Sequence, residues 1–158
     1  MPIEKIVVSK KEDLPSEHIS GHPTYEYCKS DVVPRHNGNQ SAVAFFDIAP
    51  GKSNYPYHYH NYSEEIFYII SGSGILETPD GDIPIKAGNV IFCPAGADGA
   101  HRITNTSTTE PLCYIDIDTV PKTDMCVYPK TGKIGVYTHD GFSKLYKTDD
   151  SVDYYDGE

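Results

Sequence analysis

Between residues 41 and 119 the chain consists of short apolar runs, and residues typical of turns interrupt it every few positions. The clearest runs read SAVAFFDIA, EIFYII, ILETP, DIPIK, NVIFC and LCYIDIDTV. No segment shows a convincing amphipathic helical pattern. Asp80-Gly81 and the segment 130–132 have the composition of hairpin turns. Six to eight short strands at fairly regular spacing favour an antiparallel sandwich or barrel, which is an all-β fold.

The remaining residues flank this region, and a length of 158 residues fits a single domain. Frequent Pro and Gly make residues 1–35 an N-terminal arm, in which IEKIVV could form one short strand. We expect the barrel to cover residues 36–120. Residues 121–158 would then form a C-terminal extension, with a hairpin in CVYPKTGKIGVY and an acidic, tyrosine-rich tail packed on the barrel.

Net charge and cysteine usage narrow the function classes. The formal net charge is −10 at pH 7, which argues against nucleic acid and anionic membranes as partners. The arm has no room for a helix-turn-helix head. No signal-like start and no apolar run of about 20 residues is present, so we expect a cytoplasmic protein. The four cysteines lie far apart and are expected to be reduced, with Cys93 and Cys113 as apolar filler in strands.

Two histidines in the sequence His58-Tyr59-His60 are the first candidate site residues. Alternate residues of a strand share a face, so the two imidazoles would project together, about 6–7 Å apart along the strand. Glu65 opens the next apolar run in phase with Phe67, whereas Glu64 has the opposite phase and would point outward. These residues alone fit a metal site and a pair of hydrogen-bonded histidines equally well.

A third histidine extends the pattern. The strand that begins at Gly88 closes on Pro94-Ala95-Gly96, and His101 follows in phase with Ile103 and Asn105. His101 could therefore face the same interior and complete a set of three imidazoles and one carboxylate.

Two ordered motifs carry a family resemblance. The first consists of Gly51, His58, His60, Glu65 and Gly72, and the second of Gly88, Pro94, Gly96, His101 and Asn105. In this order and spacing the chain resembles the cupin superfamily over roughly residues 41–118. The gaps before His58 and before His101 are one and two residues longer than usual. Both gaps fall in turns, so strand phase is preserved.

The resemblance implies a double-stranded β-helix (a jelly-roll barrel) with one divalent transition metal ion inside it. The implied ligands are His58, His60, Glu65 and His101, while Asn105 would hold a turn and the motif glycines would be turn residues. Three nitrogens and one oxygen suit Fe, Mn, Ni, Co or Zn, and the sequence does not choose among them.

Three functions follow from this expectation. The first is a metal-dependent enzyme acting on a small organic molecule, of the dioxygenase, decarboxylase or other lyase, or isomerase type. The second is a non-catalytic cupin that binds or senses a small ligand, and the third is an assembly part whose histidines are inert. Homodimerisation is expected through sheet edges, by a strand at residues 3–8 or by the C-terminal hairpin.

The sequence places no acid, base or phosphate clamp in the pocket. Strand phase directs Tyr57, Tyr59 and Arg102 away from the predicted ligands. The residues in phase with the ligands are apolar, and we expect them to form the pocket wall, which weakly disfavours a sugar phosphate; they are Phe67, Ile69 and Ile103.

Overall fold

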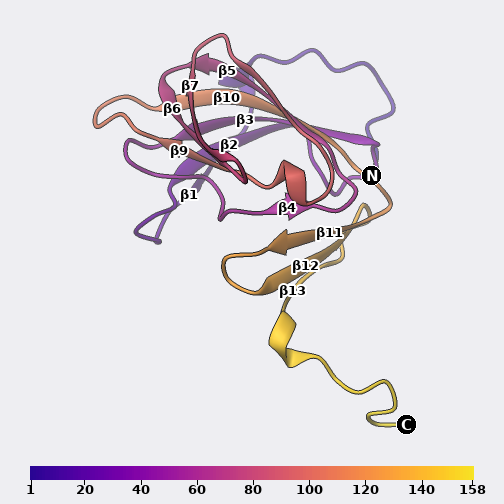
Figure 1. Ribbon diagram of the computed structural model, residues 1–158. Helices are drawn as coiled ribbons and strands as arrows, with labels where there is room; N and C mark the ends of the chain where they lie inside the picture. The colour runs from indigo at the N-terminus through magenta and orange to yellow at the C-terminus, as the bar shows by residue number, and fades with distance from the viewer.

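The computed structural model describes residues 1–158, and its regular secondary structure consists almost entirely of β-strands (Figure 1). The thirteen strands are β1 (Glu17–Ile19), β2 (Tyr27–Val33), β3 (Ser41–Ile48), β4 (Tyr59–His60), β5 (Glu65–Ser71), β6 (Ser73–Thr78), β7 (Gly81–Lys86), β8 (Val90–Cys93), β9 (Arg102–Asn105), β10 (Leu112–Thr119), β11 (Thr123–Tyr128), β12 (Lys133–Thr138) and β13 (Ser143–Lys147). The three helical segments are single turns of three residues, and none could cross a membrane. The predicted all-β class is confirmed.

Two layers of antiparallel strands enclose the core. One layer is a six-stranded sheet in the order β1-β2-β3-β10-β5-β8. The other combines a three-stranded sheet, β7-β6-β9, with a four-stranded sheet, β13-β12-β11-β4. Reciprocal backbone hydrogen bonds between His58 and His101, of 3.1 and 2.9 Å, join these two smaller sheets. The arrangement is the predicted double-stranded β-helix, and its seam runs through two of the predicted ligands.

Strict alternation along β3 and β10 creates the core. Every second residue of each strand is buried, and Phe46 of β3 stacks on Tyr114 of β10 with ring centroids 5.1 Å apart. Phe67, Ile69 and Ile103 are buried in the same cluster. They lie in the packed interior and not along the open cavity, so the prediction that these three residues form the pocket wall is wrong.

Two turns show how glycine directs the chain. Gly72, between β5 and β6, has a φ of +85°, and a Cβ there would lie 2.6 Å from the carbonyl oxygen of Pro111. The predicted β6–β7 hairpin is present, but Thr78 pairs with Gly81, so Pro79 and Asp80 form its two-residue loop. Gly81 then carries the positive φ as the first residue of β7.

The barrel begins earlier than the predicted boundary at residue 36. Strand β2 pairs with β3 along most of its length and buries Tyr27 and Ser30, so part of the predicted arm belongs to the large sheet. The sequence did not predict this strand, because residues 28–31 (CKSD) show no alternation of apolar and polar side chains. The suggested strand at residues 3–8 is absent.

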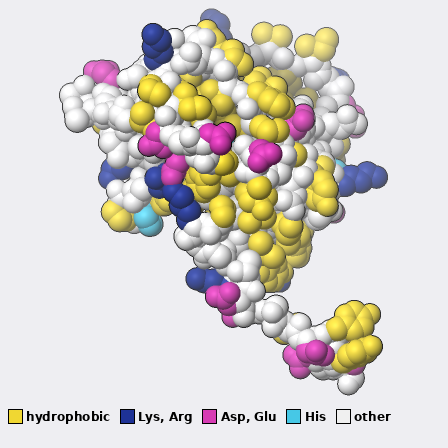
Figure 2. Space-filling model, in the orientation of Figure 1, with side chains coloured by type: hydrophobic (Ala, Val, Ile, Leu, Met, Phe, Trp, Pro, Cys, Tyr) yellow, Lys and Arg dark blue, Asp and Glu magenta, His cyan; other side chains and the backbone are white.

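The C-terminal extension divides into two parts. The predicted hairpin is formed by β11 and β12, and β11 joins the barrel by pairing with β4, where Cys126 lies opposite His60. Residues 140–158 are all exposed, and the last of them project away from the barrel (Figures 1 and 2). The tail is therefore not packed on the barrel, because its carboxylates would lose hydration without gaining cationic partners. Homodimerisation through the C-terminal hairpin stays a prediction.

Candidate metal centre

The structure brings the four predicted ligands to one place inside the barrel. His58 and His101 lie at the seam between the two smaller sheets, His60 lies on β4, and Glu65 begins β5. All four side chains are buried, whereas Glu64 is exposed, as its phase predicts. The carboxylate of Glu65 lies between two imidazoles: Oε1 is 3.6 Å from Nε2 of His60, and Oε2 is 3.5 Å from Nε2 of His101.

The outer nitrogen of each imidazole is already engaged. Nδ1 of His58 lies 2.8 Å from the carbonyl oxygen of Pro56, and Nδ1 of His101 lies 2.9 Å from that of Gly99. Nδ1 of His60 lies 2.5 Å from a carboxylate oxygen of Asp124. Carbonyl and carboxylate oxygens only accept, so each Nδ1 must donate its proton. In the neutral imidazole, Nε2 is then the nitrogen that carries the free lone pair.

The distances around Glu65 fit a shared cation better than direct hydrogen bonds. Separations of 3.5 and 3.6 Å are too long for hydrogen bonds. Two ligand atoms that each lie about 2.1 Å from one tetrahedral ion are about 3.4 Å apart. A negative carboxylate next to three imidazole lone pairs is therefore compatible with a bound metal ion.

The protonation states agree with this fit. Burial lowers the pKa of His58 to about 4, so its imidazole is neutral at pH 7. Burial acts to raise the pKa of Glu65, but His101, His60, His58 and Arg35 outweigh it and hold that pKa below its ordinary value. The centre thus contains a neutral imidazole at His58 and, at Glu65, a carboxyl group whose pKa is held low, and both are forms that bind metals.

A cysteine from the extension lies next to the same centre. Two overlapping groups have their ligand atoms within 4.8 Å of one another: His58 with Glu65 and His101, and His58 with His60 and Cys126. Burial raises the pKa of the Cys126 thiol to about 12, so it is protonated at neutral pH. Sequence reasoning did not single out this cysteine.

A cavity of about 190 Å³ opens beside the centre, and its wall combines apolar and charged side chains. The wall includes His58, His60 and Glu65 together with charged side chains that the sequence analysis did not place; these are Lys29, Asp31, Arg35, Asp116 and Asp118. Tyr57, Tyr59 and Arg102 do not line it, as their phase predicts.

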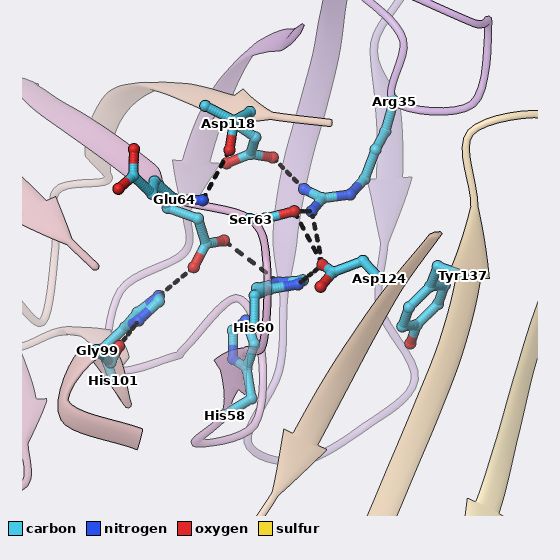
Figure 3. Close-up of polar contacts among 12 residues, drawn as sticks. Arg35, His58, His60, Ser63, Glu64, Gly99, His101, Asp118, Asp124 and Tyr137 are labelled. Atoms are coloured by element: carbon cyan, nitrogen blue, oxygen red, sulfur yellow. Dashed lines mark hydrogen bonds and ion pairs between the residues drawn. The ribbon is translucent and has the colours of Figure 1, made fainter. Parts of the chain in front are cut away.

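Arg35 connects two carboxylates at the edge of the cavity (Figure 3). Its NH1 group pairs with Asp118, and its NH2 group donates to Oγ of Ser63 at 2.8 Å and lies 3.7 Å from Asp124. Burial acts to raise the pKa of Asp124, but hydrogen bonds from His60 and Ser63 hold it well below its usual range. Arg35 and Asp124 are therefore a charged pair, and Asp124 links that pair to His60.

Asp116 is a cavity carboxyl group whose surroundings favour its protonated form. Burial, the charge of Asp118 and the charge of Glu65 all raise the pKa of Asp116, well above its ordinary value. One oxygen of Asp116 and one of Asp118 are buried without a hydrogen-bond partner. A carboxylic acid of this kind can deliver a proton to a molecule in the cavity.

Some of these missed residues had a signal in the sequence. Asp116 and Asp118 are in phase with Leu112 and Tyr114, so alternation along LCYIDIDTV already places both carboxyl groups inside the barrel. Asp124 is likewise in phase with Cys126, whereas Arg35 follows a strand that the sequence concealed and gave no signal of its own.

Residues 44–118 match the family described as "Cupin domain". The "Oxalate-binding protein" of Thermotoga maritima is 40% identical over 63 residues, which are 40% of this chain and 50% of that protein. The match thus spans about half the length of that curated relative.

Solved structures resemble the chain over a larger part of its length. A candidate sugar phosphate isomerase of Acidithiobacillus ferrooxidans has a TM-score of 0.75 and 26% identity, covering 89% of this chain and 90% of that one. A predicted oxalate decarboxylase of Thermotoga maritima has a TM-score of 0.63 and 27% identity, covering 73% of this chain and 100% of that one. Both motifs, the barrel and these matches agree that residues 44–118, just under half of the chain, form a cupin domain.

Proposed function

We propose that the protein is a metal-dependent enzyme that acts on a small carboxylic acid inside the barrel. The observation that carries the proposal is the meeting of two features in one cavity: imidazole Nε2 atoms around Glu65, and the buried carboxyl group of Asp116, whose pKa is raised. His58, His60, Glu65 and His101 would hold the ion, which is Fe, Mn, Ni, Co or Zn by its ligand set. When bound, the ion supplies Lewis-acid polarisation of a substrate oxygen.

The chain's own residues provide for proton transfer. Asp116 holds a proton at the cavity wall, and the ion pair between Arg35 and Asp118 fixes the neighbouring wall. Decarboxylation replaces a bond to CO₂ with a bond to hydrogen and therefore consumes one proton, and isomerisation of a hydroxy or oxo acid moves one. Burial of the site keeps water from competing for that proton.

The size and charge of the cavity favour a small acid over a sugar phosphate. A cavity of about 190 Å³ is below the range of sites for drug-sized ligands. A phosphate needs unpaired cations, but Arg35 pairs with Asp118 and Lys29 pairs with Asp31 at 2.8 Å. The relatives named for oxalate agree with this choice.

The second candidate is a small-ligand-binding cupin without turnover. The curated relative named as an oxalate-binding protein favours it, because that name describes binding alone. The two candidates share the metal centre and differ in the role of Asp116. A binding protein does not need a proton donor in its cavity.

The first experiment compares the metal content of the wild type with Glu65→Gln. Glu64→Gln is the matched control, since it removes the adjacent carboxylate on the exposed face. We expect near-stoichiometric metal in the wild type and the control, and little in Glu65→Gln, by elemental analysis. Absence of metal from the wild type, even after reconstitution, would overturn the proposal.

The second experiment separates enzyme from binding protein. Protein loaded with each candidate metal is incubated with oxalate and with short hydroxy and oxo acids, and CO₂ release, isomer formation and oxygen consumption are followed. Asp116→Asn is expected to keep metal and acid binding but to lose turnover. Acid binding without any turnover in the wild type would favour the binding protein.

A further inference from the structure

One support of the candidate metal centre comes from outside the matched residues 44–118. Asp124, on β11, is 4% exposed and accepts a hydrogen bond from Nδ1 of His60 at 2.5 Å. The same carboxylate accepts from Oγ of Ser63 at 2.8 Å and from the backbone N–H of Tyr62 at 3.0 Å. It therefore holds both an imidazole of the centre and the turn that leads from that imidazole to Glu65 (Figure 3).

We propose that Asp124 is a positioning residue that sets the metal affinity of the centre through His60. Its carboxylate fixes the proton on Nδ1 of His60 and increases the donor strength of Nε2, the nitrogen that faces Glu65. This inference rests on the proposed function, because it requires that the centre binds a metal.

His60 differs from the other two histidines in its support. His58 and His101 donate to backbone carbonyl oxygens two residues before them in the chain. His60 donates to a charged group 64 residues away. Among the three imidazoles, only that of His60 makes its Nδ1 hydrogen bond to another side chain, so only there can a point mutation remove the Nδ1 partner.

The register of β11 explains how Asp124 reaches the centre. Cys126 lies opposite His60 on β4, and Asn61 donates its backbone N–H to the carbonyl oxygen of Met125 at 2.9 Å. Asp124 is two residues before Cys126 and projects from the same face, so its carboxylate lies within the turn that follows His60. Backbone pairing thus holds the carboxylate in place independently of any metal.

The central variant is Asp124→Asn, which keeps the size of the side chain and removes its charge. If the amide nitrogen faces His60, Nδ1 must accept and the proton moves to Nε2, where it blocks metal binding. If the amide oxygen faces His60, the hydrogen bond survives without its charge. In both cases we expect metal affinity to fall about 10–100-fold.

The measurement is the Kd for Co(II) and Zn(II) by competition with a chelator, together with the visible absorption spectrum of the Co(II) protein. Asp140→Asn is the matched control, because Asp140 is exposed beyond the end of β12. Asp124→Glu keeps the charge but displaces the carboxylate by one methylene group, so we expect a smaller loss of affinity than in Asp124→Asn and a shifted Co(II) spectrum. Ser63→Ala removes another partner of Asp124 but keeps the bond to His60, and is expected to have a small effect.

The outcomes separate this inference from the proposed function. A wild type that binds no metal overturns both. A wild type that binds metal, with equal affinity in Asp124→Asn, overturns this inference alone, as does an equal loss in Ser63→Ala. Circular dichroism melts in chelator check that each variant folds. If Asp124→Asn does not fold, a Co(II) spectrum unchanged in Asp124→Glu overturns the inference, and a shifted one supports it.

Discussion

The segment that matches the family and the strands that flank it contribute to the site in different ways. Residues 44–118 supply His58, His60, Glu65 and His101. The flanks supply Arg35 and the carboxylate that holds His60. A family motif can therefore mark the candidate ligands of a metal while leaving out groups that fix their orientation and charge.

The two regions also differ in how far their contacts reach along the chain. The contacts that orient His58 and His101 span two residues each and form wherever these loops fold. Arg35 instead pairs with Asp118, 83 residues away, and through Asp124 it links the predicted arm to the C-terminal extension. Local contacts therefore orient the imidazoles of His58 and His101, whereas the contacts made by the flanks form only once the whole barrel has assembled.

The largest effect is expected from Arg35→Met, which tests whether the flank is essential to the barrel. The change leaves Asp118 and Asp124 buried without their cation, and removing one partner of a buried ion pair costs about 3 kcal/mol or more. The free energy of unfolding is measured by urea denaturation. Circular dichroism gives the fraction folded.

Arg102→Met is the matched control, because these are the two arginines of the chain. Arg102 pairs with Glu77 at the surface of the matched segment, with side-chain exposures of 32% and 21%. Such a pair contributes about 1 kcal/mol or less. If both variants lose the same free energy of unfolding, the flank does not contribute more to the stability of the barrel than the matched segment does.

The sequence predicted the fold class and the residues that converge at the site because both follow from periodicity. Alternation along a strand decides which residues face inward, and it placed Glu65 inside and Glu64 outside as the structure does. Alternation cannot show which distant strand lies opposite, so the contact between Asp124 and His60 was beyond its reach.

The phase of a residue along a strand shows whether its side chain faces inward, but not whether it reaches the cavity or lies in the packed core. For this reason the residues of the pocket wall were predicted wrongly. Phe67 and Ile103 face inward as predicted but are 2% and 1% exposed, so they lie below the cavity in the packed core. Strands β2, β3 and β10 supply eight of the seventeen residues that line the cavity. Alternation along β10 directs Asp116 inward, as alternation along β5 directs Phe67 inward. The inward position of Asp116 could therefore have been predicted by the same argument.

A smaller effect, with a defined pH dependence, is expected from Asp116→Asn in metal-free protein. Since burial raises the pKa of Asp116 in the folded state, the unfolded chain loses this proton first as pH rises above about 4. Wild-type stability therefore falls with rising pH through this group, until the pH passes the folded-state pKa. Asp116→Asn has no carboxyl group to titrate here, so its stability does not fall in this way as pH rises. At pH 7–8 its free energy of unfolding should exceed that of the wild type by about 1–3 kcal/mol.

Urea denaturation at several pH values, in the presence of chelator, measures this difference. The wild type and Asp116→Asn should differ least near pH 4 and diverge as pH rises. A gap that narrows with rising pH would show that Asp116 is ionised in the folded protein. The proton donor of the proposed mechanism would then be missing.

The smallest effect is expected from removing residues 149–158. This deletion separates the contribution of the exposed tail from that of the hairpin in the C-terminal extension. These residues are exposed and carry five carboxylates without a cation, so the deletion changes the net charge from −10 to −5 and exposes no core. Stability should change by less than about 0.5 kcal/mol and metal affinity should not change. Thermal melts and the Co(II) competition assay check both. Unchanged values would confine the contribution of the extension to the hairpin that carries Asp124, whereas a loss of metal affinity would give the tail a part in the site that its exposure does not suggest.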